Sequence, residues 1–347
     1  MIAPALRGGL LALLAATLFG VSTPLVQYFG TGLGALSTAA LLYAGAAVAG
    51  ALLRRPAHQE AALRRSDLPR LLAVVAFGAV IGPVALAWGL QRTSGASASL
   101  MLTLEALFTA VLAWRLYRET MDARVWVAMA LLLAGGVLLI LGQGRLGGTQ
   151  LVGMLAVLVA TAAWGIDNTL SRALAERDPG QVVMVKAALG AAVTALLALV
   201  FSESAPRWGA VAGLLAVGAT GYGLSLRFYL LAQRAFGVAR TGSVFAFAPF
   251  IGAVLALAMG DRSVSAWAGA GGLLMLGGVL LHLMESHGHA HDHAALDHEH
   301  AHNHADGHHQ HTHSPMPEGS HSHPHHHEAQ DHAHPHVPDA HHLHRHG

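Results

Sequence analysis

Long runs of apolar residues, separated by short polar loops, dominate the chain up to residue 284. Ten runs of roughly 20 residues can each cross about 30 Å of hydrocarbon as an α-helix. They cover residues 8–29, 34–53, 71–90, 96–115, 124–142, 151–170, 181–201, 209–232, 241–259 and 265–284. The pattern predicts an all-α polytopic membrane protein with about ten transmembrane helices. We interpret the first run as a retained span and not as a signal peptide, because no small-residue cleavage site followed by soluble sequence ends it.

The arginines in the connecting loops predict the orientation of these helices. With the amino terminus in the cytoplasm, thirteen arginines fall on the cytoplasmic side and only Arg92, Arg145, Arg207 and Arg262 on the other. Short loops rich in Lys and Arg remain in the cytoplasm. We therefore expect a multi-pass protein of the cell (plasma or inner) membrane with both termini in the cytoplasm.

The chain also contains an internal repeat. A shift of 142 positions aligns Gln91-Arg92 with Gln233-Arg234, Glu119 with Asp261, and "GGVLL" at 135–139 with "GGVLL" at 277–281. Because each half holds five helices, an odd number, the second half enters the membrane inverted relative to the first. Inverted repeats of this kind are typical of alternating-access transporters that bind substrate near the membrane midplane.

Composition agrees with a membrane protein and excludes other classes. Apolar residues make up 54% of the chain and charged residues 11%, whereas roughly a quarter of an ordinary soluble domain is charged. Its 40 glycines suit closely packed transmembrane helices, and the absence of cysteine removes disulfides and thiolate metal sites. Nothing in the chain indicates an enzyme, a nucleic-acid binder or a required cofactor, and its oligomeric state cannot be read from the sequence.

Three segments carry a resemblance to a known family. They are "AAWGIDN" at 162–168, "LTLEALFTAVLAW" at 102–114 followed by "RET" at 118–120, and "FAFAPFIGAVLALAMGDR" at 245–262. Together they resemble the EamA-type transporters of the drug/metabolite transporter superfamily. The resemblance implies two five-helix EamA repeats, at residues 8–142 and 151–284, cytoplasmic termini, and the movement or export of small metabolites. It fixes the transport class and leaves the cargo open.

Few ionisable residues fall within the predicted spans, and each needs a physical reason. Glu105, Asp167, Lys186 and Arg227 would each cost roughly 2.5 to 3.5 kcal/mol near the bilayer centre, so they should face the protein interior or a water-filled cavity. Glu105 is the deepest. It can act as a proton-coupling carboxylate or as a ligand for a cationic substrate group, or it can form a structural ion pair with Lys186 or Arg227.

The other candidate pathway residues are weighed against structural roles. Lys186 lies close to the start of its span, which favours a side chain that reaches the cytoplasmic surface, whereas the deeper Arg227 is the better candidate for a substrate contact. Asp167 and Asn168 follow Trp164, and their short side chains can either bind substrate or hydrogen-bond a neighbouring helix. Three further residues complete the predicted pathway, Gln27, Trp88 and Tyr222. The two aromatic residues can instead anchor their helices at the membrane interface, which is the commoner role of such side chains.

The remaining residues, 285–347, differ completely from the helical part. Of the 26 histidines, 24 follow Ser286, and this segment lacks an apolar period, so we expect a disordered cytoplasmic tail. Closely spaced imidazoles suit Zn²⁺, Ni²⁺, Co²⁺ and Cu²⁺. The candidate metal ligands are His287, His289, His291, His293, His298, His300, His302, His304, His325, His326 and His327.

Three functions remain open from the sequence. The first is a secondary transporter that exports small polar metabolites such as amino acids, with the tail as an accessory. The second keeps the transporter scaffold but carries a divalent transition metal, although the spans contain no cysteine and only His282. The third is a membrane-anchored metal or pH sensor that transports nothing. In each case the bilayer and either a small molecule or metal ions are the expected partners.

Overall fold

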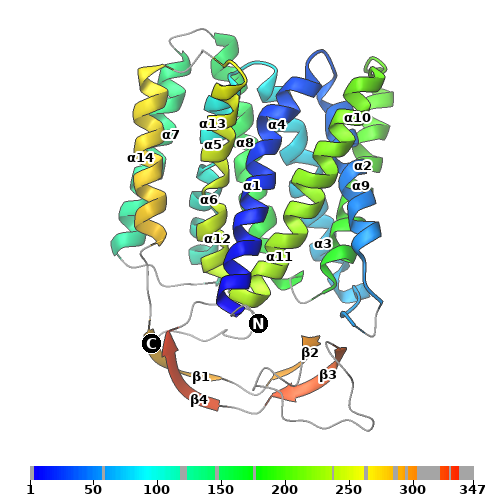
Figure 1. The fold of residues 1–347 in the computed structure, drawn as a ribbon, viewed down its shortest axis with the longest axis vertical. Helices are drawn as coiled ribbons and strands as arrows, with labels where there is room; N and C mark the ends of the chain where they lie inside the picture. Colours follow the sequence, from blue (N-terminus) through cyan, green and yellow to red (C-terminus); the bar gives the residue numbers. More distant parts are fainter. Residues whose placement is uncertain are drawn as a thin grey trace.

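Helices that run from one end of the molecule to the other form a single bundle (Figure 1). The computed structural model describes residues 4–56, 59–117, 123–144, 148–174, 177–236, 238–261, 265–283, 288–293, 296–302, 321–327 and 330–335. The end of the bundle at which the chain starts is called the amino-terminal end, and the opposite one the far end.

The ten apolar runs are helical, although several consist of more than one segment. The first repeat contains α1 (Pro4–Gly30), α2 (Ala35–Leu53), η1 (Arg65–Asp67), α3 (Leu68–Val74), the π-helix η2 (Val75–Ile81), α4 (Gly82–Leu90), α5 (Gly95–Met101), α6 (Leu104–Tyr117) and α7 (Ala123–Gly144). The second repeat contains α8 (Gly148–Ser171), η3 (Arg172–Leu174), α9 (Pro179–Val200), α10 (Trp208–Val217), the π-helix η4 (Gly218–Leu224), α11 (Ser225–Phe236), α12 (Val238–Phe245), α13 (Ala248–Ala258) and α14 (Ala266–Leu283).

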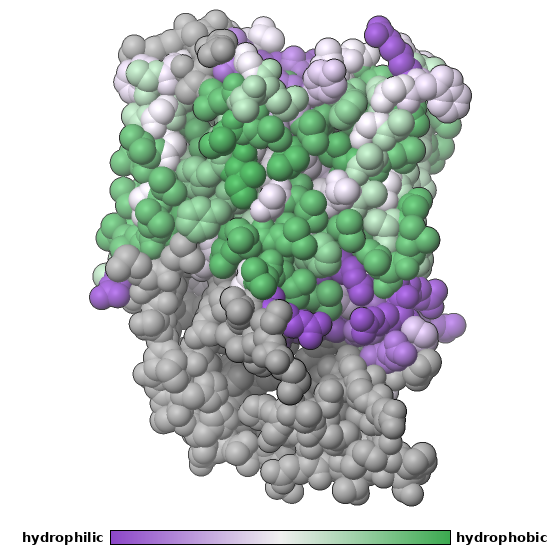
Figure 2. All heavy atoms as spheres, in the orientation of Figure 1, coloured by the Kyte–Doolittle hydropathy of each residue, from purple (hydrophilic) through white to green (hydrophobic). Residues whose placement is uncertain are grey.

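The lengths and surfaces of these helices fit a bilayer. Within the described residues, nine helices are long and apolar enough to cross a membrane, and the tenth, at Ala266–Leu281, is shorter. Exposed apolar side chains such as Leu52, Leu199 and Leu273 cover the bundle surface, where a water-soluble protein would place polar groups. Figure 2 shows them as a broad band over the helices, with hydrophilic side chains gathered at its amino-terminal edge. The prediction of a multi-pass membrane protein is confirmed.

The two repeats share irregularities as well as helix number. The third span of each repeat contains a seven-residue π-helix, η2 in the first and η4 in the second. The fourth span of each is broken, between α5 and α6 in one and between α12 and α13 in the other. Shared interruptions of this kind cannot follow from similar apolar composition alone, so the structure supports the repeat seen in the sequence.

Equivalent helices of the two repeats pack against each other. The second spans, α2 and α9, form one such pair, and the fifth spans, α7 and α14, form another. Glycines permit the close approach: a Cβ on Gly135 would lie 2.6 Å from the backbone oxygen of Gly271, and a Cβ on Gly271 would lie 2.8 Å from that of Gly135. The two repeats therefore pack together through their second and fifth spans.

Four short strands of the tail lie beyond the amino-terminal end of the bundle (Figure 1). Strand β1 (Gly288–His293) pairs antiparallel with β4 (Gln330–Pro335), and β2 (Leu296–His302) pairs with β3 (His321–His327). The prediction of a tail without regular structure is not supported for these segments. Since a two-stranded pair is at best marginally stable in water, the disorder of the metal-free tail stays a prediction to be tested.

Nine of the eleven candidate metal ligands lie on these strands. His289, His291 and His293 belong to β1, and a further six belong to β2 and β3. That set is His298, His300, His302, His325, His326 and His327. His287 and His304 lie outside the described residues.

Candidate functional site

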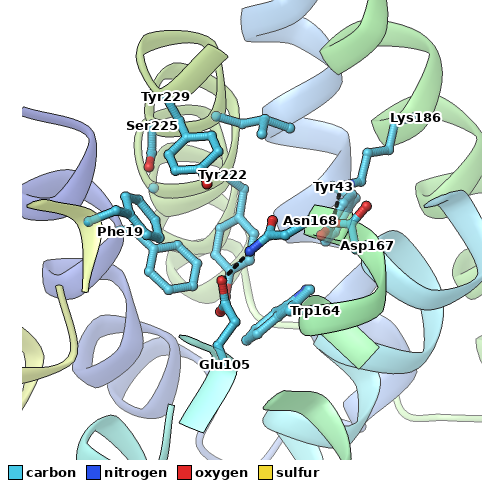
Figure 3. A pocket seen from close by; sticks show the side chains of 13 residues that line it. Phe19, Tyr43, Glu105, Trp164, Asp167, Asn168, Lys186, Tyr222, Ser225 and Tyr229 are labelled. Atoms are coloured by element: carbon cyan, nitrogen blue, oxygen red, sulfur yellow. Dashed lines mark hydrogen bonds and ion pairs between the residues drawn. The ribbon is translucent and has the colours of Figure 1, made fainter. Parts of the chain in front are cut away.

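A pocket lies inside the half of the bundle nearer the amino-terminal end. Its walls come from both repeats, and it holds about 490 Å³ of space not filled by atoms, part of which is open to the surroundings. The lining residues are Phe19, Tyr43, Glu105, Trp164, Asp167, Asn168, Lys186, Gly221, Tyr222, Ser225, Leu226, Tyr229 and Phe245. Six of the nine pathway residues predicted from the sequence are among them (Figure 3).

Lys186 and Asp167 form a buried ion pair at one side of the pocket. The Lys186 Nζ on α9 lies 2.5 Å from Oδ2 of Asp167 on α8, and the two side chains are only 5% and 7% exposed. The hydroxyl of Ser171 donates to the other carboxylate oxygen, Oδ1, over 3.2 Å. The sequence favoured a Lys186 side chain that reaches the membrane surface. This prediction is wrong, because a carboxylate lies within reach inside the bundle.

The π-helix η2 packs against this ion pair. Gly78 stands where a Cβ would overlap the Asp167 carboxylate. In a π-helix the Gly78 carbonyl would accept a hydrogen bond from residue 83, but Pro83 has no N–H to give. The carbonyl instead accepts from the Trp164 indole Nε1 over 3.1 Å and from the Tyr43 hydroxyl. The helical irregularity thus positions two side chains of the pocket.

Glu105 enters the pocket from the opposite side. It lies in the first turn of α6, directly after the break in the fourth span, and the Asn168 amide of α8 donates to its Oε1. Figure 3 shows its carboxylate directed toward Asn168 between aromatic rings. Within the described residues Glu105 has no ion pair, so the alternative of a structural pair with Lys186 or Arg227 is not what the structure shows.

Aromatic rings from several helices surround the Glu105 carboxylate. The ring centroid of Phe19 on α1 lies 5.7 Å from that of Trp164, 5.8 Å from that of Tyr222 and 5.3 Å from that of Phe245. Tyr229 extends the cluster, with its centroid 5.0 Å from that of Phe245. The sequence singled out Trp164 and Tyr222 but not Phe19 as pathway residues. Phe19-Gly20 corresponds to Trp164-Gly165 at a shift of 145 positions, close to the repeat shift of 142, and this correspondence was the signal that could have identified Phe19.

Arg227 does not line this pocket. The Arg227 Nη1 on α11 donates over 2.8 Å to the carbonyl of Leu53, the last residue of α2. It belongs to a polar network at the amino-terminal end, in which Arg234 pairs with Glu60 at 2.8 Å. The sequence favoured Arg227 as a substrate contact at membrane depth. Its long side chain instead reaches the end of α2, at the amino-terminal end of the bundle.

Gln27 and Trp88 lie toward the far end, away from the pocket. The Gln27 amide on α1 donates to the carbonyls of Leu90 and Thr93 over 2.8 and 3.0 Å. The Arg92 guanidinium lies 3.6 Å from the ring centroid of Trp88. Gln27 also lines a separate polar cleft at the far end with Asp261. The structure therefore does not bring these two predicted residues to the Glu105 pocket.

The helix segments of the broken fourth spans pack tightly at the far end of the bundle and more loosely at the amino-terminal end. At the far end α5 packs against α13, and both contact α1, where a Cβ on Gly252 would lie only 2.7 Å from the Gly20 oxygen. At the amino-terminal end no comparable packing joins α6 or α8 to α12 in the described part of the chain. Tight helix contacts thus close the pocket toward the far end, and the described residues of α6 and α8 form no such contacts with α12 on its other side.

An inverted pair of five-helix repeats, enclosing a polar pocket within a membrane-spanning bundle, defines the class of membrane transporters. The sequence model of the EamA-like transporter family matches residues 6–141 and 151–284, so the chain belongs to the EamA-like transporter family. It is 28% identical over 241 residues to an uncharacterized transporter of Methanothermobacter thermautotrophicus, an alignment that covers 66% of this chain and 68% of the relative. A solved crystal structure shares the fold with a TM-score of 0.58 and 21% identity, over 79% of this chain and 94% of that one.

Proposed function

We propose that this chain is a secondary transporter that exports small polar metabolites, such as amino acids, across the cell membrane by alternating access. The observation that carries the proposal is the Glu105 pocket, because it holds a carboxylate that forms no ion pair with any described residue inside a membrane-spanning bundle. Such a group is costly to retain unless it meets a substrate or a coupling proton. Both repeats contribute lining residues, as expected where a transporter binds its substrate.

The orientation and the packing of the broken spans support the export direction. The loop arginines favour a cytoplasmic amino-terminal end. The side of the pocket without tight helix packing then faces the cytoplasm, where metabolites are made. We propose that the described arrangement is the one that receives substrate from the cytoplasm, and that packing of α6 and α8 against α12 would close it.

The histidine-rich tail is proposed as an accessory that binds divalent transition metals on the cytoplasmic side. The thirteen histidines of its four described strands alternate with other residues or adjoin one another, which provides pairs of imidazoles within chelating distance along an extended chain. The pocket itself contains no histidine among its described lining residues. We therefore propose that the transport step requires no resident cofactor and that the tail does not form the pathway.

Flux measurements with three forms of the chain test the proposal. Proteoliposomes with the full chain, the chain ending at Ser286, and Glu105→Gln would be loaded with a mixed amino-acid pool, with ⁶⁵Zn²⁺ and ⁶³Ni²⁺ in parallel. Metabolite flux that survives removal of the tail and falls at least tenfold with Glu105→Gln is the expected result. Glu203→Gln is the matched control, because Glu203 accepts hydrogen bonds from the α2 backbone outside the pocket.

Two outcomes would overturn the proposal. Metal flux that disappears with the tail, without any metabolite flux, would make the histidines the functional residues and a divalent metal the cargo. The absence of flux of every solute, together with metal-dependent changes in the full chain, would instead indicate a membrane-anchored sensor.

A further inference from the structure

We propose that the Glu105 pocket selects a compact organic cation, a protonated amine or quaternary ammonium that carries one net positive charge. The inference rests on the transport function proposed above and names the substrate class of that same site. The positive group would lie at the Glu105 carboxylate and against the faces of the surrounding aromatic rings. Among the small polar metabolites of the proposed function, amino acids included, members with a net positive charge would be bound in preference to acidic and net-neutral ones.

The charges of the pocket are the first argument. Asp167 and Lys186 neutralise each other at 2.5 Å, so in their ionised forms they leave no net charge. Within the described part of the chain, the hydrogen-bond partner of Glu105 is the neutral amide of Asn168, which supplies a single hydrogen bond to a group that can accept about four. When Glu105 is ionised, one negative charge therefore remains unpaired among the described lining residues, and a buried charge of this kind gains most from a mobile cation.

The aromatic rings are the second argument, independent of the charges. Phe19, Trp164 and Tyr222 contact one another with centroid separations of 5.7, 5.8 and 6.3 Å, and Figure 3 shows the Glu105 carboxylate beside them. Phe19 and Phe245 offer no polar atom, so they recognise a ligand only by its shape and through their π faces. Ring faces gathered around one site attract ammonium groups, most strongly where water is excluded.

Other ligand classes fit this lining less well. An anion would have to separate Lys186 from Asp167 and then lie near Glu105, while a zwitterion would bring its own carboxylate toward two acidic side chains. A dehydrated divalent metal needs several oxygen or imidazole ligands converging on one point. In the described lining the two carboxylates instead have different partners, Asn168 for Glu105 and Lys186 for Asp167. A compact, weakly hydrated organic cation would be attracted both by the ionised Glu105 carboxylate and by the faces of the aromatic rings.

Three probes of nearly equal shape test the charge requirement. Choline carries one positive charge, glycine betaine has the same trimethylammonium group but no net charge, and 3,3-dimethylbutan-1-ol replaces the ammonium by carbon. Binding to the purified full chain in lipid nanodiscs would be measured by calorimetry. We expect choline to bind at least tenfold more tightly than its neutral analogue, since a desolvated cation–π contact alone is worth about that factor. Equal affinity for choline and the neutral alcohol would overturn the inference.

Variants assign the effect to the two parts of the site. Glu105→Gln keeps an acceptor for Asn168 but removes the charge, and should weaken choline binding more than tenfold. Phe19→Leu removes one ring face and should weaken it several-fold, whereas Phe19→Tyr retains the ring and should restore it. The control is Trp114→Leu, because Trp114 is 44% exposed on the bundle surface and pairs with Trp126 outside the pocket. Choline affinity unchanged by both Glu105→Gln and Phe19→Leu would also contradict the inference.

The failure of this inference can be distinguished from the failure of transport. Glu105-dependent flux of acidic or neutral metabolites, without choline binding, would overturn the cation preference and leave the transporter intact. Glu105-dependent choline binding without flux of any solute would retain the binding site and overturn transport.

Discussion

Gly78 of η2 lies directly against the carboxylate of Asp167 on α8, with no room for a Cβ between them. At the same place in the other repeat, a Cβ on Gly221 of η4 would lie 2.5 Å from the Cβ of Ser22 on α1. Both π-helices therefore use a glycine to let the first helix of the opposite repeat approach. In one repeat that helix carries an acid at the contact, and in the other a hydroxyl. Because Asp167 has Ser22 as its counterpart, only one of the two contacts brings a charged group to the pocket.

Replacement of this glycine should damage the pocket before it damages the fold. Gly78→Ala would force the Asp167 carboxylate away from Lys186, and overpacking of this type costs about 1–3 kcal/mol. We expect a lower thermal midpoint and reduced substrate flux. Gly269→Ala in α14 is the matched control, since nothing lies within 4 Å of its added methyl group, and it should leave both unchanged or slightly raise the midpoint. A Gly78→Ala protein as stable and active as wild type would show that the contact is not tight.

The Asp167–Lys186 pair should show strong coupling in a double-mutant cycle. Removal of one partner from a buried ion pair costs about 3–5 kcal/mol, because the other charge is left uncompensated. Lys186→Met alone should therefore lower stability strongly, whereas Lys186→Met combined with Asp167→Asn should recover most of the loss. Thermal unfolding in detergent measures both. If the Lys186 side chain reached the membrane surface instead, Lys186→Met would cost little and the second substitution would recover nothing.

The sequence predicted the spans and the repeat well, because hydropathy and spacing report directly on which segments cross a bilayer. It also singled out Glu105, Asp167 and Asn168, which line the pocket, since a polar or ionisable group within an apolar run has few reasons to be there. It was less informative on Lys186 and Arg227. Depth along a helix can be counted from the sequence, but the direction of a long side chain depends on its neighbours. Lys186 contacts a carboxylate inside the pocket, and Arg227 a free carbonyl at the end of α2.

The aromatic part of the pocket was also difficult to predict. Phe19 lies in an apolar run, where only its correspondence with Trp164 in the other repeat distinguishes it from other apolar residues, and its contacts with Trp164 and Phe245 join helices far apart in the sequence. The π-helices left no recognisable pattern either. Only the fold shows that Pro83 leaves the Gly78 carbonyl free for Trp164.

The tail should bind metal in a manner that depends on pH. Imidazole binds metal only when neutral, and its ordinary pKa is near 6.5, so affinity should fall steeply as the pH drops from about 7.5 to 5.5. Zn²⁺ titration of the full chain by calorimetry should show several sites, nearly all of them absent from the chain ending at Ser286. Equal Zn²⁺ binding by both forms would place the metal sites in the helical part of the protein.

Covalent closure of the far end should stop transport if access alternates between the two sides. The chain contains no cysteine, so an engineered pair is the only possible disulfide. A Cβ on Gly95 of α5 would lie 3.5 Å from the Cβ of Ala256 on α13, within the range that a disulfide spans. Its closest neighbour is the side-chain oxygen of Gln27, which can rotate away.

Gly95→Cys combined with Ala256→Cys should therefore transport substrate when reduced and lose flux when oxidised, with recovery on addition of dithiothreitol. Binding of substrate from the amino-terminal side should persist in the oxidised form, because the disulfide closes only the far end and leaves the Glu105 pocket unchanged. The two single-cysteine variants control for effects of each substitution and should be insensitive to oxidation. Undiminished flux through the fully crosslinked protein, verified by mass spectrometry, would mean that α5 and α13 do not separate during transport, and that the substrate leaves by a route other than the far end.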